Sequence, residues 1–97
     1  MSDAHRGSGP LRRELEIRNQ YGIHARPASM FVKTAARFES EVYVEKDGNV
    51  VSGKSIMGLM TLQASFGSTL KVSAEGPDAV ELLDALQALV ESKFGEE

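Results

Sequence analysis

The stretch YGIHARPASMF, residues 21–31, changes the hydrophobic period of the chain to that of an α-helix. From Ala25 onward, apolar residues recur at the spacing that is typical of one buried helix face. Pro27 fits only in the first turn of such a helix, because the first amide groups have no intrahelical acceptor. The pattern therefore predicts a helix that begins at about Ala25 and leaves His24 at its N-cap. The apolar positions on this face are Ala28, Phe31, Val32, Ala35 and Phe38.

Three stretches around this helix alternate apolar and polar residues, which is the period of a half-buried strand. RRELEIRN, residues 12–19, precedes the helix and leads into a turn marked by Asn19 and Gly22. EVYVEKDGNVVS, residues 41–52, contains Asp47-Gly48, a pair that favours a two-residue hairpin turn between two strands. STLKVSAEG, residues 68–76, predicts a further strand. The apolar residues of the alternation are Leu15, Ile17, Val42, Val44, Leu70, Val72 and Ala74.

Two further helices are expected. Ser55 can cap a short helix within GKSIMGLMTLQA, residues 53–64, and Gly76-Pro77-Asp78 starts a last, longer helix. The resulting order, βαββαβα, predicts an α+β fold: a two-layer open-faced β-sandwich with a four-stranded, mostly antiparallel sheet and helices on one face. The apolar face of the last helix comprises Ala79, Leu82, Leu83, Leu86, Leu89, Val90 and Phe94.

Composition limits the function classes. The chain has 97 residues, a formal net charge of -3 and no cysteine. This length allows one small domain, which we place at residues 12–97, after a tail at residues 1–11. The acidic balance argues against a nucleic-acid partner, and the lack of cysteine excludes disulfides and thiolate metal sites. No apolar run approaches the ~20 residues that span a membrane, and we expect a cytoplasmic protein. Basic residues gather in the first half, which suits an acidic partner near Arg26.

The predicted N-cap position gives the ring of His24 a distinct electrostatic environment. Free amides and the positive dipole end of the helix lie beside the ring and disfavour imidazolium. A neutral imidazole nitrogen can attack a phosphoryl group, whose charge the backbone amides of Ala25 and Arg26 and the guanidinium of Arg26 would stabilise. The alternative is that His24 is only a polar cap and Arg26 a surface residue. No triad partner of a hydrolase lies nearby, and two histidines, one of them in the tail, make no plausible zinc site.

These residues also carry a resemblance to a known family. GIHARPASMFVKTAARFES, residues 22–40, resembles the active-site segment of HPr, the histidine phosphocarrier of the bacterial phosphoenolpyruvate-dependent phosphotransferase system. GKSIMGLMTL, residues 53–62, resembles the second signature of that family, around its regulatory serine. The similarity runs from about Arg13 to Phe94, nearly without gaps.

The resemblance implies a phosphocarrier without independent turnover, with strands in the order 1-4-2-3. His24 would accept a phosphoryl group on Nδ1 from an enzyme I-type donor, Arg26 would stabilise the phosphohistidine, and an EIIA-type protein would receive the group. We expect no cofactor, no metal, no insertion into a membrane, and a monomer. Two alternatives stay open: a regulatory binding module of the same fold, whose phosphorylation only selects partners, and an unrelated small ligand-binding domain. The choice between sugar uptake and nitrogen or carbon regulation also stays open.

The short helix raises a separate question about partners. A helix this short cannot bury every side, so we predict that Leu59 and Leu62 pack inward. Ile56, Met57 and Met60 are expected to be partly exposed. In HPr-like proteins this helix flanks the active histidine, which implies that these three residues and Ala25 form a docking surface. The resemblance also implies that Ser55 is a target of HPr kinase/phosphorylase in bacteria that have this enzyme. Two roles of Ser55 stay open, that of a helix cap and that of a regulatory phosphorylation site.

Overall fold

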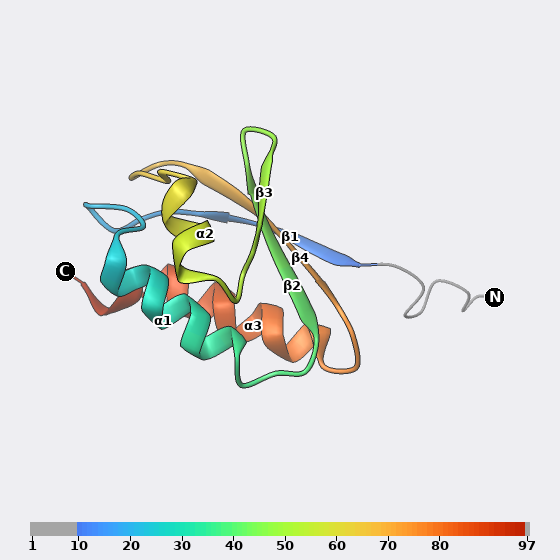
Figure 1. Ribbon diagram of the computed structural model, residues 1–97. Helices are drawn as coiled ribbons and strands as arrows, with labels where there is room; N and C mark the ends of the chain where they lie inside the picture. Colours follow the sequence, from blue (N-terminus) through green and yellow to red (C-terminus); the bar gives the residue numbers. More distant parts are fainter. Residues whose placement is uncertain (1–9, 97) are drawn as a thin grey trace.

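The computed structural model describes residues 10–96 as a four-stranded antiparallel sheet with three α-helices (Figure 1). In Figure 1, α1 and α3 lie side by side, and the C-terminal segment lies near the start of α1. This arrangement confirms the predicted α+β sandwich. The elements are β1 (Leu11–Glu16), α1 (Ala25–Ala35), β2 (Glu41–Lys46), β3 (Asn49–Ser52), α2 (Ile56–Thr61), β4 (Thr69–Glu75), α3 (Ala79–Glu91) and a 3-10 helix, η1 (Lys93–Gly95).

The strands lie in the order β1-β4-β2-β3, as expected. β4 pairs with both β1 and β2, so Leu70 lies opposite Leu15 and Val72 lies opposite Val44. Alternate residues of β4 are buried, which is the pattern of a strand with one covered face. The buried residues of the sheet pack with those of the helices into a single core. Its largest fully buried side chains are Phe31, Phe94, Ile17, Leu59, Leu70, Leu82, Leu83, Leu86, Val42, Val44, Val72 and Val90.

The predicted tail falls mostly outside the described residues. Of residues 1–11 the structure describes only Pro10 and Leu11. Leu11 already belongs to β1, where it lies opposite Ala74, so the strand begins one residue before the predicted domain boundary.

Three buried or partly buried residues lie outside the elements predicted for them. β1 ends at Glu16, and Ile17 follows it, fully buried, with its N–H donating to the carbonyl of Ser68 at 2.8 Å. Phe38 follows the end of α1 and is only partly buried against the core. Phe94 was predicted on the last helix, but α3 ends at Glu91 and Phe94 lies in η1, still fully buried. Burial was thus predicted correctly at these positions, whereas the local backbone was not.

Gly22 places the start of α1 against the loop that follows α2. Its φ is +70°, in the left-handed region that favours glycine. The next amide, that of Ile23, donates to the carbonyl oxygen of Ala64 at 2.8 Å. A Cβ on Gly22 would lie inside contact distance of that same oxygen and 2.8 Å from the Cα of Ser65. The two loops are therefore in backbone contact two residues before His24.

Asp78 joins the start of α3 to the segment before β2. Its carboxylate accepts hydrogen bonds from the Ser40 hydroxyl at 2.6 Å, the Ser40 amide at 2.9 Å and the Glu39 amide at 3.0 Å. These donors favour the ionised carboxylate, so the Ser40 hydroxyl first and the Glu39 amide next hold the pKa of Asp78 below its ordinary value of 3.8. The contact fixes where α3 begins relative to the sheet.

The pH dependence of stability tests this contact. Because the pKa of Asp78 is lowered in the folded state, its contribution is present above the pKa of the unfolded chain and is lost as the pH falls through the folded value. Asp78→Asn should therefore unfold at lower urea concentration than the wild type at about pH 7, with the difference shrinking below about pH 4. Asp47→Asn, the same change in an exposed turn, serves as the control. A difference that is independent of pH would contradict the assignment.

Two glycine substitutions test the loop contact. Gly22→Ala should destabilise the fold by about 2–5 kcal/mol, because it adds a left-handed Cβ penalty and an overpacked contact. Gly48, in the Asp47-Gly48 hairpin turn, also has a positive φ, +83°, but a Cβ there would meet no atom within 4 Å. Gly48→Ala should therefore cost only the first penalty, about 1–2 kcal/mol. Urea unfolding measures both, and equal losses would show that the contact of the two loops contributes nothing.

Candidate functional site

His24 is the N-cap of α1, as predicted. Its backbone is extended, with φ -109° and ψ -166°, and its side chain makes no capping hydrogen bond. Its carbonyl oxygen accepts the first hydrogen bond of the helix, from the amide of Ala28 at 2.9 Å. The ring is therefore not used to cap the helix, and the side chain is 44% exposed, accessible to a partner.

The first turn of α1 presents donors next to this ring. The amides of Ala25 and Arg26 have no intrahelical acceptor, and no other acceptor contacts them among residues 10–96. The first turn contains no acidic residue that would neutralise the positive end of the helix dipole. Pro27, which has no N–H, is buried in this turn. The structure thus brings together the ring of His24, two free amides and the side chain of Arg26, the group that the sequence predicted as a phosphate site.

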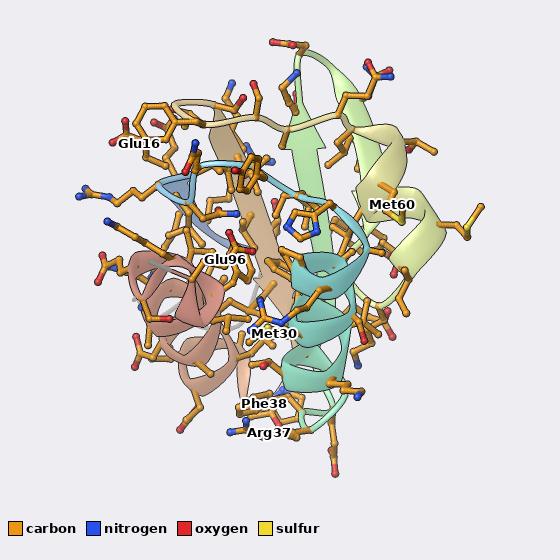
Figure 2. The ribbon with its side chains drawn as sticks, turned by 90° about the vertical axis from the view of Figure 1, so that its left-hand side faces the viewer. Glu16, Met30, Arg37, Phe38, Met60 and Glu96 are labelled. Atoms are coloured by element: carbon orange, nitrogen blue, oxygen red, sulfur yellow. The ribbon has the colours of Figure 1, made fainter. Side chains whose placement is uncertain are left out.

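A carboxylate that the sequence did not predict also lies at this site. Oε2 of Glu96 is 3.0 Å from Nε2 of His24 and 3.6 Å from Nη1 of Arg26. Its side chain is only 18% exposed. Figure 2 shows Glu96 between α3 and the first turn of α1. An acidic residue 72 positions along the chain from His24 is therefore part of the site.

The backbone after α3 explains how Glu96 reaches His24. Lys93, Phe94 and Gly95 all have positive φ values, of 60°, 55° and 75°. This run turns the chain, and the fully buried ring of Phe94 anchors it in the core. The sequence signal is an apolar residue followed by glycine just beyond a helix, which indicates a turn but not its target.

Asn19 holds the other carboxylate oxygen of Glu96. Its side chain is fully buried, and its Nδ2 donates to the carbonyl of Gly22 at 2.7 Å and to Oε1 of Glu96 at 3.3 Å. Its Oδ1 is buried without a partner among the described residues. The sequence indicated Asn19 only as a turn residue, although it connects the turn before His24 to the C-terminal segment.

Ser55 caps α2, as expected from its position. Its hydroxyl oxygen accepts a hydrogen bond from the amide of Gly58 at 2.9 Å. The cap role of Ser55 is therefore confirmed, and the residue is partly exposed on the surface that α2 presents.

The apolar side chains of α2 divide as predicted between core and surface. Leu59 and the following Leu62 are buried, whereas Ile56, Met57 and Met60 are 40%, 74% and 39% exposed. We refer to these three exposed residues as the α2 patch, in which Figure 2 labels Met60. α2 packs against α1, and the loop that follows α2 is hydrogen-bonded to the loop that precedes His24. The α2 patch and the ring of His24 therefore lie on adjoining elements.

Two aromatic side chains that the sequence analysis did not single out are also exposed here. Tyr21 and Phe66 are 73% and 66% exposed, and they lie in the two loops joined by the hydrogen bond from Ile23 to Ala64. In contrast, part of the positive charge predicted for the first half of the chain is neutralised, because Arg13 forms an ion pair with Asp84 at 2.7 Å.

Within residues 10–96, no helix is both long and apolar enough to cross a bilayer.

Comparisons with known proteins show the family of this chain. The family described as "PTS HPr component phosphorylation site" matches residues 11–92. The chain is 45% identical over 83 residues to the HPr-like protein Crh of Halalkalibacterium halodurans, covering 86% of this chain and 99% of that protein. It is 44% identical over 86 residues to the phosphocarrier protein HPr of Neisseria meningitidis, covering 89% and 97%.

Solved structures lead to the same family. The crystal structure of HPr-C-His from Thermoanaerobacter tengcongensis matches with a TM-score of 0.86 and 53% identity over 90% of this chain and 98% of that one. A second structure from that organism, described as an HPr dimer, matches with a TM-score of 0.72 and 55% identity over 84% and 94%. The members named HPr are phosphocarriers, which pass on a phosphoryl group and have no turnover of their own. With its two motifs, its sheet order and this match over most of its length, the chain belongs to the HPr family of phosphocarriers of the phosphotransferase system.

Proposed function

We propose that His24 is the residue of this phosphocarrier that accepts the phosphoryl group, on Nδ1, from an enzyme I-type donor, and that an EIIA-type protein receives it. The observation that carries this proposal is the partly exposed ring of His24 at the N-cap of α1, which does not cap the helix and lies beside two amides that have no acceptor among residues 10–96. A phosphohistidine there places an anion where a helix N-terminus favours one.

Arg26 has a separate part in this proposal. A phosphoryl group carries about two negative charges near neutral pH, and a guanidinium offers it several donors in one plane. Within residues 10–96, Arg26 pairs with Glu96 at 3.6 Å, which is longer than a good hydrogen bond. A phosphoryl group on His24 would therefore offer Arg26 a closer and more highly charged partner than Glu96 does.

The α2 patch and Ala25 are proposed to be the docking surface for donor and acceptor. Exposed methionine side chains adapt to partners of different shape, which suits a carrier that meets at least two proteins.

The phosphocarriers of this family meet their partners in the cytoplasm, and we propose the same location for this chain. The expected monomer stays a prediction, because several solved relatives are described as dimers.

Phosphorylation of Ser55 is proposed to regulate this surface. The hydroxyl already lies at the N-terminus of α2 beside Ile56 and Met57, so a phosphate there would add charge at the edge of the α2 patch. Incubation with an HPr kinase/phosphorylase and ATP should modify the wild type, whereas Ser55→Ala should stay unmodified by phosphopeptide mass. An unmodified wild type, with a kinase active on a known HPr, would remove the regulatory role and leave only the cap.

The site assignment is tested by phosphorylation from phosphoenolpyruvate. With an enzyme I that is active on a known HPr, the wild type should gain one acid-labile phosphoryl group by intact mass. His24→Ala should gain none, and His5→Ala, the matched change at the other histidine, should behave as the wild type. Arg26→Ala should accept the group about tenfold more slowly, because a charge-assisted hydrogen bond contributes about 1.5–3 kcal/mol and this side chain is half exposed. Labelling of His24→Ala would contradict the assignment.

A charge placed at Ser55 tests the docking surface. Aspartate is as good an N-cap as serine, so Ser55→Asp should leave the unfolding midpoint unchanged. Its charge beside the α2 patch should slow phosphorylation of His24 about tenfold if an acidic partner docks there. Ser52→Asp adds the same charge at an exposed position of β3 and should have a smaller effect. Equal rates for the two variants would contradict docking at the α2 patch.

A further inference from the structure

We infer that Glu96 is a positioning residue for phosphoryl transfer, which holds the ring of His24 with its proton on Nε2 and its free electron pair on Nδ1. The inference rests on the proposed role of His24 as the phosphoryl acceptor. It concerns a residue near the end of the chain that lies in neither sequence motif and outside residues 11–92, the range of the family match.

The geometry around the ring specifies which nitrogen carries the proton. Oε2 of Glu96 lies 3.0 Å from Nε2, which is a hydrogen-bond distance, and an ionised carboxylate only accepts. Nε2 must therefore be the donor. In the neutral ring the other nitrogen, Nδ1, then has no proton and keeps its electron pair.

The carboxylate is itself held in place. Its second oxygen accepts from Nδ2 of the buried Asn19 at 3.3 Å, and the backbone on its N-terminal side is anchored by the buried ring of Phe94. The side chain of Glu96 is 18% exposed, compared with 44% for His24. Asn19, Glu96 and His24 thus form a chain of contacts in which the inner members orient the outer one.

The chemistry of the transfer gives this contact a purpose. The electron pair on Nδ1 of the neutral ring forms a bond to phosphorus, while the bond between phosphorus and the donor atom breaks and its electron pair stays with the donor. No proton has to move, and the ring of His24 becomes positively charged as the bond forms. Glu96 at Nε2 stabilises that charge. When the phosphoryl group passes on to the acceptor, the bond from Nδ1 to phosphorus breaks, and the proton held on Nε2 lets the ring leave as a neutral imidazole. Within residues 10–96, the charged groups at this contact are Glu96, which contacts the ring, and Arg26, which pairs with Glu96.

The experiment compares Glu96→Gln, which keeps the shape and removes the charge, with Glu96→Ala, which also removes the acceptor. Glu75→Gln removes one charge at an exposed position at the end of β4 and is the matched control. Nitrogen-15 NMR of the His24 ring in the unphosphorylated proteins measures which nitrogen carries the proton. The initial rate of phosphorylation by phosphoenolpyruvate and enzyme I, at several carrier concentrations, separates kcat from KM.

In the wild type and in Glu75→Gln, the ring should be the Nε2–H tautomer with Nδ1 unprotonated. Glu96→Gln should show a larger share of the Nδ1–H tautomer and a kcat lower by about 3- to 10-fold with KM unchanged, and Glu96→Ala a larger loss. Neither variant removes a core side chain, so both should fold.

Three results would overturn the inference. If ring tautomers and rates match the wild type, Glu96 does not act on the ring. A faster transfer in Glu96→Gln would mean that Glu96 competes with the phosphoryl group, and a raised KM with unchanged tautomers would place its role in docking. If the wild type itself accepts no phosphoryl group on His24, the proposed function fails first, and the ring spectra alone report whether the contact exists.

Discussion

The backbone contact between the loop before α1 and the loop after α2 is the constraint on which the site depends. The amide of Ile23 is bonded to the carbonyl of Ala64, and Gly22 leaves no room there for a side chain. This contact fixes the position in space of the first turn of α1, and therefore where the amides of that turn point. It also joins the loop before His24 to the loop after α2, so that the candidate site and the α2 patch lie on adjoining elements.

A phosphocarrier needs a site that accepts an anion readily and releases it again. The donors at the start of α1 favour the anion, whereas the carboxylate of Glu96 brings a negative charge to within hydrogen-bond distance of the same ring. If His24 carries the phosphoryl group, as proposed, these opposing charges suit a group that is transferred onward rather than held. The half-exposed position of His24 also favours release of an anion, because solvent weakens the electrostatic interactions that would hold it there.

The patterns with local causes were predictable from the sequence. The Asp47-Gly48 turn follows from two residues that tolerate positive φ, and both adopt it, at 52° and 83°. The start of α1 follows from Pro27, and the exposure of Met57 follows from the shortness of α2. The path of the chain at Phe94 was not predictable. Phe94 matches the apolar spacing of α3, but the backbone leaves the helix before this residue.

By itself the sequence determined the order of strands and helices, the buried faces, and the placing of His24 at a helix N-cap, since these depend on neighbours within a few residues. The tertiary structure alone decided which distant groups meet that ring. Glu96 and Asn19 are 77 positions apart, and nothing in their local sequence indicates that they share a hydrogen bond. Their meeting depends on how α3 packs against the sheet and on the turn around Phe94, and no local pattern encodes such a long-range contact.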